Sequence, residues 1–182
     1  MDEREAELVE KASYKAQDIA DWFLAWTYSD DSIKITKLKL QKLLYYAQAY
    51  ALLRFGRPLF GDEIQAWKHG PVVPSVWKDF TNSTKNDNDV VLTNDFDFNL
   101  FDKEENQLLA DVWQTFASYH AKHMENLTHK DEPWKINWDN DEPEGRQRIN
   151  YSLILDCYAE RAYIEYMHSE EGKNLANYIR AS

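Results

Sequence analysis

The stretch "TKLKLQKLLYYAQAYALLRFG", residues 36–56, decides the fold because it predicts one long helix. Its apolar residues recur at intervals of three and four positions, which places them on one continuous helical face. The hydroxyl of Thr36 can cap the start of this helix, and Gly56 has the conformational freedom that commonly ends one. We therefore expect the helix to pack one apolar face against the core. This face consists of Leu40, Leu43, Leu44, Ala47 and Ala51.

A polar stripe runs along the same helix beside its apolar face. It consists of Lys37, Gln41, Tyr45 and Gln48, and Lys42 lies next to it. Residues 34–61 hold six basic residues and no acidic one, although the whole chain has a formal net charge of -11. Amide, phenol and ammonium groups suit an adaptable interface, so we predict that this stripe docks a protein partner. The alternative is a solvated helix face with Tyr45 packed at its edge.

The segment "RPLFGDEIQAWKHGPVVPSVWKDF", residues 57–80, predicts a small β element followed by a helix. Residues 64–68 alternate between apolar and polar, which is typical of a short strand. Gly70 and Pro71 then favour a turn, and Pro74 suits the first turn of a helix. The segment is therefore expected to form a small hairpin that leads into a helix.

Within that segment, "KHGPVVPSVW", residues 68–77, is interpreted as a structural junction. We expect it to hold the central helix against the core, with Trp77 buried. A second short strand is predicted within residues 90–101, with Phe96 and Phe98 on one side. The β element is thus expected to contain two or three short strands.

Several further helices follow from the same apolar periodicity. The helix that starts at Asp102 has the strongest local signal, because Glu105 completes a capping-box pattern three residues later. The complete set covers residues 11–28, the segment from Asp102, a short helix within 118–134 that ends before Pro133, the segment from Ser152, and a last helix around Leu175 and Ile179.

These elements predict a mainly α protein. We expect a single helical domain over residues 1–182 with a small β-hairpin or a short two- to three-stranded sheet. A chain of this length is sufficient for one full hydrophobic core and short for two ordinary domains.

Composition excludes several classes of protein. Apolar residues make up 43% of the chain and charged residues 29%, so a fibrous or low-complexity protein is excluded. The net charge of -11 makes nucleic-acid binding an unfavoured function. No apolar run is long enough for a membrane span, and the acidic start "MDEREAELVE" is unlike a signal peptide, so we expect a cytoplasmic protein without membrane contact. The single cysteine, Cys157, is expected to be a buried thiol.

No catalytic or metal-binding pattern is complete in the sequence. His120 and His123 are three residues apart, whereas a helical HExxH zinc site needs histidines four residues apart. No GxSxG turn and no glycine-rich phosphate loop is present. We therefore predict no catalytic residue, no cofactor and no metal. The other metal-ligand candidates nearby are Glu125, His129 and Asp131.

His129 is better explained as a structural residue. A buried imidazole needs a hydrogen-bond partner for each ring nitrogen, and we expect His129 to fix the turn before Pro133. Trp134 is then expected to insert into the core, where tryptophan surrounded by apolar neighbours usually lies.

Three blocks of sequence together resemble a known family. They are "KLKLQKLLYYAQAYAL" at 37–52, "RPLFGDEIQAWKHGPVVPSVWKDF" at 57–80 and "LTHKDEPW" at 127–134. In this order they are similar to the Panacea domain, or SocA-like antitoxin domain, of bacterial and phage toxin–antitoxin pairs. The resemblance spans about 11–165, which leaves 166–182 as a C-terminal helical extension. It implies a largely helical domain, without enzymatic activity, whose partner is the toxin protein that it neutralises.

The resemblance also implies which residues recur in the family. His69 departs from the pattern, because the family often has an aromatic residue before the Gly-Pro pair, and it is interpreted as a variant at a packing position. We expect a structural role for Trp67, His69, Gly70, Pro71, Trp77, His129, Pro133 and Trp134. The recurrent positions fall on Lys39, Leu40, Gln41, Lys42, Leu43, Tyr45, Tyr46 and Gln48, on Leu59, Phe60, Ala66, Trp67, Gly70, Pro71 and Val72, and on His129, Pro133 and Trp134.

Two other functions remain open at this point. The first is a phage or mobile-element interaction protein, such as a proteolytic adaptor, that acts on a host factor. The second, ranked last, is a metal- or nucleotide-dependent enzyme. A toxin gene next to this one would favour the antitoxin hypothesis, whereas the sequence leaves open the oligomeric state, the identity of the toxin and the docking surface.

Overall fold

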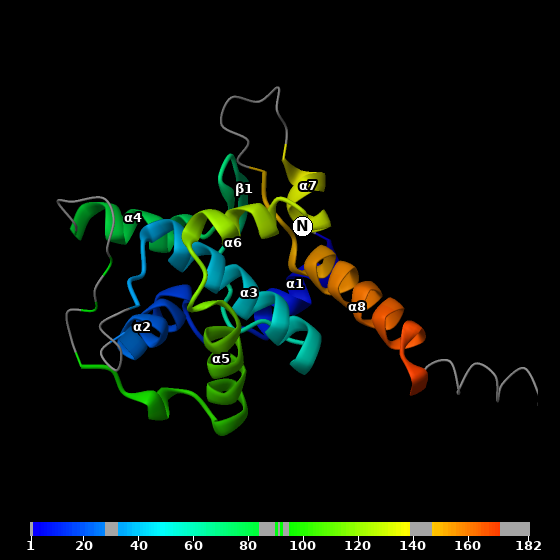
Figure 1. Cartoon of the computed structure of the whole chain (residues 1–182), viewed down its shortest axis with the longest axis horizontal. Coiled ribbons are helices and arrows are strands. Elements are labelled where there is room, and N and C mark those ends of the chain that lie inside the picture. Colours follow the sequence, from blue (N-terminus) through cyan, green and yellow to red (C-terminus); the bar gives the residue numbers. More distant parts are fainter. Residues whose placement is uncertain are drawn as a thin grey trace, which may run out of the picture.

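The structure, a computed structural model, describes residues 2–27, 33–83, 90, 92, 95–138 and 147–171. Within these ranges the fold is mainly helical with one two-stranded antiparallel sheet, which confirms the predicted fold class (Figure 1). The elements in chain order are α1 (Glu3–Glu10), α2 (Ala16–Trp26), α3 (Lys37–Phe55), β1 (Gln65–Trp67), β2 (Gly70–Val72), α4 (Pro74–Ser83), the 3-10 helix η2 (Phe98–Leu100), α5 (Lys103–Phe116), α6 (Ala121–Thr128), α7 (Glu132–Asn137) and α8 (Tyr151–His168).

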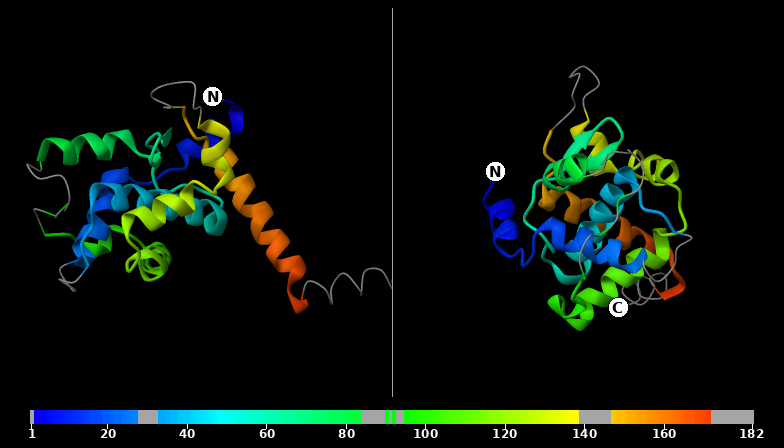
Figure 2. Two further views of the ribbon diagram at one scale, coloured as in Figure 1. Left: turned by 45° about the horizontal axis from the view of Figure 1, so that its top comes forward. Right: turned by 90° about the vertical axis from the view of Figure 1, so that its left-hand side faces the viewer.

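Helix α3 lies at the centre of the molecule, with α2, α4, α5, α6, α8 and β2 packed around it (Figures 1 and 2). Its ends are where the sequence predicts them. The hydroxyl of Thr36 accepts a hydrogen bond from the backbone nitrogen of Lys39 at 3.2 Å, and Gly56 ends the helix at a φ of 65°. The predicted apolar face is buried. Because α3 is surrounded, most of its other residues are buried as well.

The predicted hairpin is present, but Gly70 and Pro71, for which a turn is expected, lie in strand β2. Strands β1 and β2 pair antiparallel, with Gln65 opposite Val72 and Trp67 opposite Gly70. Arg148 forms an isolated antiparallel bridge to Gln65, so the chain just before α8 runs beside the outer edge of β1. The segment just before α8 therefore lies against the edge of β1 that does not pair with β2.

The prediction of a second strand within residues 90–101 is wrong for those residues of the segment that the structure describes. Phe98 begins η2, and the side chain of Asp97 caps this short helix by accepting a hydrogen bond from the nitrogen of Asn99 at 2.9 Å. The rings of Phe96 and Phe98 still contact each other, with centroids 5.1 Å apart. A local aspartate cap thus replaces the extended conformation that the alternating phenylalanines suggest.

Other predicted helices are present with shifted ends. Helix α5 starts at the predicted capping box, in which Asp102 and Glu105 exchange backbone-to-carboxylate bonds of 2.8 and 3.0 Å. The short helix α6 ends before Pro133 as predicted, and Pro133 itself lies in the first turn of a further helix, α7. The last predicted helix, around Leu175 and Ile179, lies outside the described residues.

The N-terminal region differs from the expectation. The helix predicted over 11–28 begins at Ala16, and an additional helix, α1, precedes it. The carboxylate of Glu5 in α1 is fully buried and accepts hydrogen bonds from the backbone nitrogens of Tyr151 and Ser152, at 3.0 and 2.9 Å. Ser152 therefore does not cap α8 itself, because α1 supplies the cap from a distant part of the chain.

One hydrophobic cluster joins residues from α1 to α8, from Leu8 to Tyr158. Cys157 and Trp77 are partly exposed, so the expectation that both are buried is wrong. Trp77 packs edge-on against Trp67, with ring centroids 5.8 Å apart. No helix within the described ranges is both long and apolar enough to cross a membrane.

Candidate functional site

The polar stripe predicted to dock a partner is buried in the folded chain. None of its four residues is more than 8% exposed, and the adjacent Lys42 is fully buried. Both hypotheses drawn from the sequence place the stripe at the surface, and this expectation is wrong because neighbouring elements cover this part of α3. A contact between these side chains and a partner stays a prediction, and burial counts against it. The five residues are Lys37, Gln41, Lys42, Tyr45 and Gln48.

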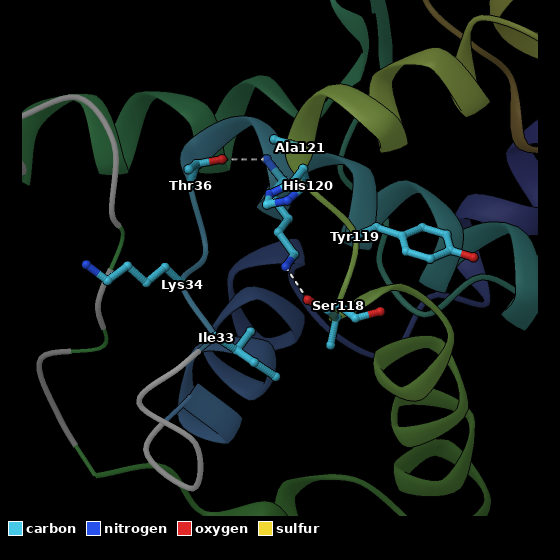
Figure 3. Close-up of a pocket in the computed structure, with 9 residues that line it drawn as sticks. Ile33, Lys34, Thr36, Ser118, Tyr119, His120 and Ala121 are labelled. Carbon is cyan, nitrogen blue, oxygen red and sulfur yellow. Dashed lines mark hydrogen bonds between the residues drawn. The ribbon is translucent and has the colours of Figure 1, made fainter.

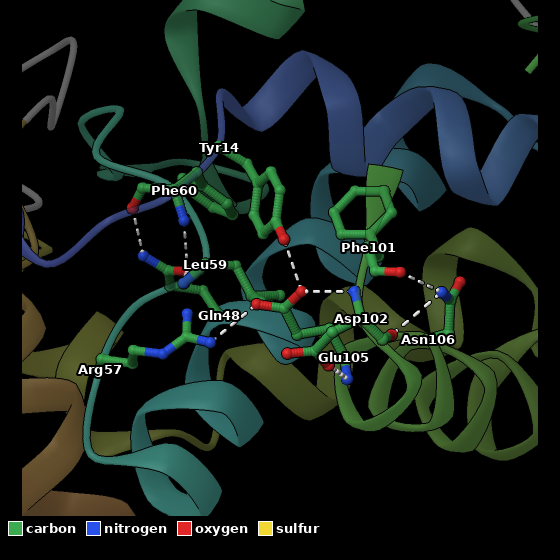
Figure 4. A network of polar contacts seen from close by, with 9 residues as sticks. All are labelled: Tyr14, Gln48, Arg57, Leu59, Phe60, Phe101, Asp102, Glu105 and Asn106. Carbon is green, nitrogen blue, oxygen red and sulfur yellow. Dashed lines mark hydrogen bonds and ion pairs between the residues drawn. The ribbon is translucent and has the colours of Figure 1, made fainter. Parts of the chain in front are cut away.

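The two glutamines of the stripe hold the chain that follows α3. The amide oxygen of Gln48 accepts hydrogen bonds from the nitrogens of Leu59 and Phe60 at 2.9 and 3.3 Å (Figure 4). Its amide nitrogen donates to the carbonyl of Phe60 at 2.7 Å. Gln41 accepts a bond of 2.7 Å from the nitrogen of Val73, directly after β2. The glutamines therefore supply the partners that buried backbone groups outside regular structure require.

Lys42 holds the hairpin itself. Its ammonium group is fully buried and donates a hydrogen bond of 2.8 Å to the carbonyl of Pro71. Burial lowers the pKa of Lys42 to about 7, and the nearby Glu125 opposes this shift. Gly70 lies so close that a Cβ atom there would be 2.8 Å from the ammonium nitrogen and 2.5 Å from the hydroxyl of Thr128. The lysine and the glycine are thus two parts of one tight contact between α3, β2 and α6.

A carboxylate of α6 lies at the edge of this contact. Glu125 is 3% exposed, and it accepts hydrogen bonds from Lys122 at 2.7 Å and from a ring nitrogen of His69 at 3.2 Å. Burial alone would raise the pKa of Glu125, but its hydrogen bonds to Lys122 and His69 lower the pKa below its ordinary value. The side chain of His69 is 62% exposed. The interpretation of His69 as a packing residue is therefore wrong, since it links the hairpin turn to α6 at the surface.

Trp134 is buried as the sequence predicts, and His129 lies against it. Their rings stack with centroids 4.2 Å apart, and the indole nitrogen of Trp134 donates to the carbonyl of Trp67 at 2.9 Å. Burial lowers the pKa of His129, whose ring also bonds to the backbone of Lys68. Its Nε2 atom has no partner among the residues that the structure describes, so only one of the two expected bonds is found. The predicted motif thus joins β1 to the α6–α7 corner.

Two buried carboxylates outside the predicted motif organise other contacts. Glu105 accepts hydrogen bonds from the hydroxyl of Tyr14 at 2.5 Å and from Arg57 at 2.7 Å, which ties the segments before α2 and after α3 to α5 (Figure 4). Asp131 accepts from the hydroxyl of Tyr158 at 2.9 Å and from Arg161 at 3.0 Å. Sequence reasoning gave Glu105 only a capping role and left Asp131 without a partner, because the residues that bond to both are distant in the chain.

A cavity of about 600 Å³ lies where the N-terminal ends of α3 and α6 meet (Figure 3). Lys39 lines it and donates a hydrogen bond to the carbonyl of Ala117. Of the histidines considered as metal ligands, His120 also lines this cavity. His129 does not line it and stacks on Trp134 instead. Over the described ranges, no three histidine, cysteine or acidic side chains are arranged to hold a metal ion. The absence of bound zinc stays a prediction for elemental analysis.

Comparison with known proteins identifies the family. The model of the family described as "Antitoxin SocA-like, Panacea domain" matches residues 40–135, more than half of the chain. Antitoxin SocA of Caulobacter vibrioides (strain NA1000 / CB15N) is 49% identical over 49 residues, which cover 27% of this chain and 26% of the relative. The alignment thus spans about a quarter of the relative's length, and no solved structure gives a significant match. The family match begins in α3 and ends in α7, so it contains the hairpin and the contacts of Lys42, and the chain belongs to the SocA-like Panacea domain family.

Proposed function

We propose that this protein is an antitoxin that binds a toxin protein and neutralises it by direct contact. The observation that carries this proposal is the family match over residues 40–135. The 49% identity to Antitoxin SocA supports it over a shorter segment. The proposal includes a non-enzymatic mechanism, in which the antitoxin changes the fate of the toxin through binding alone.

The positions of the motif residues suggest which part of the protein forms the scaffold and which part recognises the toxin. Most side chains that recur in the family are internal, such as Gln48 and Lys42, and they fix the hairpin against α3. Buried residues of this kind specify the scaffold, whereas recognition depends on side chains that a partner can reach. We therefore assign the motif to the scaffold and expect the toxin to meet exposed residues.

The test is co-expression with the product of the adjacent gene. If that product alone arrests growth, the antitoxin should restore growth, and the two purified proteins should form a complex by size-exclusion chromatography with light scattering. A matched control is the destabilised variant Gly70→Ala, which should restore growth less well in proportion to its loss of soluble protein. Persistent growth arrest in the presence of soluble wild-type chain, without complex formation, would overturn the proposal.

A second measurement separates two ways of neutralising a toxin. If the antitoxin covers the toxin's active site, the toxin should persist in the cell in an inactive form. If the antitoxin delivers the toxin to a protease, the toxin's half-life should shorten when the antitoxin is present and recover in a strain lacking that protease. A pulse-chase experiment on the toxin decides between them.

A further inference from the structure

The second half of α8 carries apolar side chains that the rest of the described chain leaves uncovered. The first half packs on the core through Tyr151, Ile154 and Tyr158. The helix then extends beyond the other described helices, as Figure 1 and the left view of Figure 2 show. Three large side chains follow in this part, Tyr163, Ile164 and Tyr166, which are 63%, 46% and 41% exposed.

Two of them, Tyr163 and Tyr166, are here called the α8 patch, and they resemble the centre of a protein interface. Tyr163 and Tyr166 are three residues apart and so lie on one side of the helix, whereas Ile164 lies on another side. Tyrosine is enriched among the residues that dominate binding energies, because its ring is large and rigid and its hydroxyl is polar. Neighbouring exposed apolar groups commonly mark such a surface, whereas single ones are ordinary.

The charge around the α8 patch indicates which kind of partner fits it. Glu160 and Glu165 are exposed on the same two turns. Arg161 is the one basic residue of residues 159–167, and it is already paired with the buried carboxylate of Asp131 at 3.0 Å. A second copy of this chain would bring an equally acidic surface against the patch. A partner with basic residues around an apolar centre is therefore the better complement.

We propose that the α8 patch is the surface that docks the toxin, through a basic toxin surface with an apolar centre. This inference rests on the proposed antitoxin function and adds the place of contact. It also moves the docking surface away from the buried stripe of α3, since a partner can reach α8 without unfolding the core. The patch lies outside residues 40–135, which the family model matches.

The first experiment removes the aromatic contact. The double variant Tyr163→Ser, Tyr166→Ser should weaken binding to the purified product of the adjacent gene at least about thirtyfold, as measured by calorimetry, because interface tyrosines commonly act as hot spots. Its unfolding midpoint in urea should stay close to that of the wild type. Leu100→Ser is the matched control, because Leu100 is 47% exposed on η2, and its affinity should be unchanged.

The second experiment tests the charge. Glu160→Lys, Glu165→Lys should weaken binding about tenfold at low salt, and the loss should shrink in 0.5 M sodium chloride because salt screens exposed charges. The matched control reverses two exposed acids elsewhere, Glu104→Lys on α5 and Glu7→Lys on α1. That control should keep most of the wild-type affinity.

The possible results separate this inference from the proposed function. If the wild type binds and neutralises the toxin and the tyrosine variant does so equally well, the α8 patch is not the docking surface, although the antitoxin function stands. If the tyrosine variant instead converts a dimeric wild type into a monomer without weakening toxin binding, the patch joins two copies of this chain and the inference is wrong. If the wild type does not bind the adjacent product, both the function and the docking surface are overturned.

Discussion

Lys42 is a charged side chain in a position that water does not reach. Burial lowers its pKa from 10.5 to about 7. Between these two values the unfolded chain binds more protons than the folded chain, so the free energy of unfolding should rise with pH. The upper limit for one group is about 1.4 kcal/mol per pH unit. Above about pH 10 the trend reverses, because buried Tyr45, whose pKa is raised, ionises more readily in the unfolded chain.

The measurement is urea unfolding at pH 7, 8 and 9 for the wild type and for Lys42→Met. The wild type should become more stable across this range, whereas the variant should show a flatter dependence because methionine does not titrate. Equal slopes for the two proteins would show that Lys42 keeps an ordinary pKa and is not buried as described.

Gly70 tests the same contact sterically. It has a φ of 94°, and a Cβ atom there would lie 2.5 Å from the hydroxyl of Thr128. Gly70→Ala should therefore lower the free energy of unfolding by about 3 kcal/mol or more, from backbone strain and overpacking together. Gly56 is the matched control, since its φ is 65° but no atom lies within 4 Å of the added methyl group. Gly56→Ala should cost about 1 kcal/mol, and similar losses for both would contradict the proposed crowding.

At the scale of elements, the sequence pattern correctly predicted the ends and the apolar face of α3. It did not predict that the polar stripe of this helix is buried. The spacing of Leu40, Leu43 and Leu44 shows which residues share a face, and a cap and a glycine mark the ends. Periodicity does not show how many sides of a helix are covered by other elements. Because α3 is surrounded, Gln41 and Gln48 bond to neighbouring backbone where the sequence suggested solvent or a partner.

Gln48 shows the consequence for stability. Gln48→Met keeps the approximate shape but leaves the nitrogens of Leu59 and Phe60 and the carbonyl of Phe60 without this partner. The expected loss in the free energy of unfolding is about 3 kcal/mol or more, because each unpaired buried group is costly. Gln107→Met is the control, since Gln107 is exposed and bonds only to Asp111 in the described structure. It should change stability by less than about 0.5 kcal/mol, and an equally small effect for Gln48 would contradict its role.

For the whole molecule, the sequence predicted the fold class, and its three motif blocks indicated the family. It did not predict contacts between residues far apart in the chain, because no local pattern records them. Asp62 is one example, since it accepts hydrogen bonds from the nitrogen of Ala16 at 2.8 Å and from the hydroxyl of Ser75 at 2.6 Å. The exposure of Tyr163 and Tyr166 is another, since it depends on where the other helices end. The sequence therefore indicated the buried motif residues of the candidate site, but it did not indicate the exposed residues on α8.

The last prediction concerns the contact between α1 and α8, which joins the two ends of the described chain. Glu5 is buried, and it bonds to the nitrogens of Tyr151 and Ser152 and to Arg148 at 3.2 Å. Glu5→Ala should lower the free energy of unfolding by about 2 kcal/mol or more, because the buried nitrogens of Tyr151 and Ser152 lose their hydrogen-bond acceptor. Glu7→Ala, an exposed change in the same helix, should be nearly neutral.

Hydrogen exchange shows where the loss acts. The amides of the first turns of α8 should lose protection in Glu5→Ala more than those of α5, because α8 has no side-chain cap of its own at Asn150. Uniform loss of protection would mean that Glu5 stabilises the whole core and not this end of α8. Since the proposed toxin surface lies on the second half of α8, selective loss at its first half should also weaken neutralisation, although Glu5 itself need not touch the toxin.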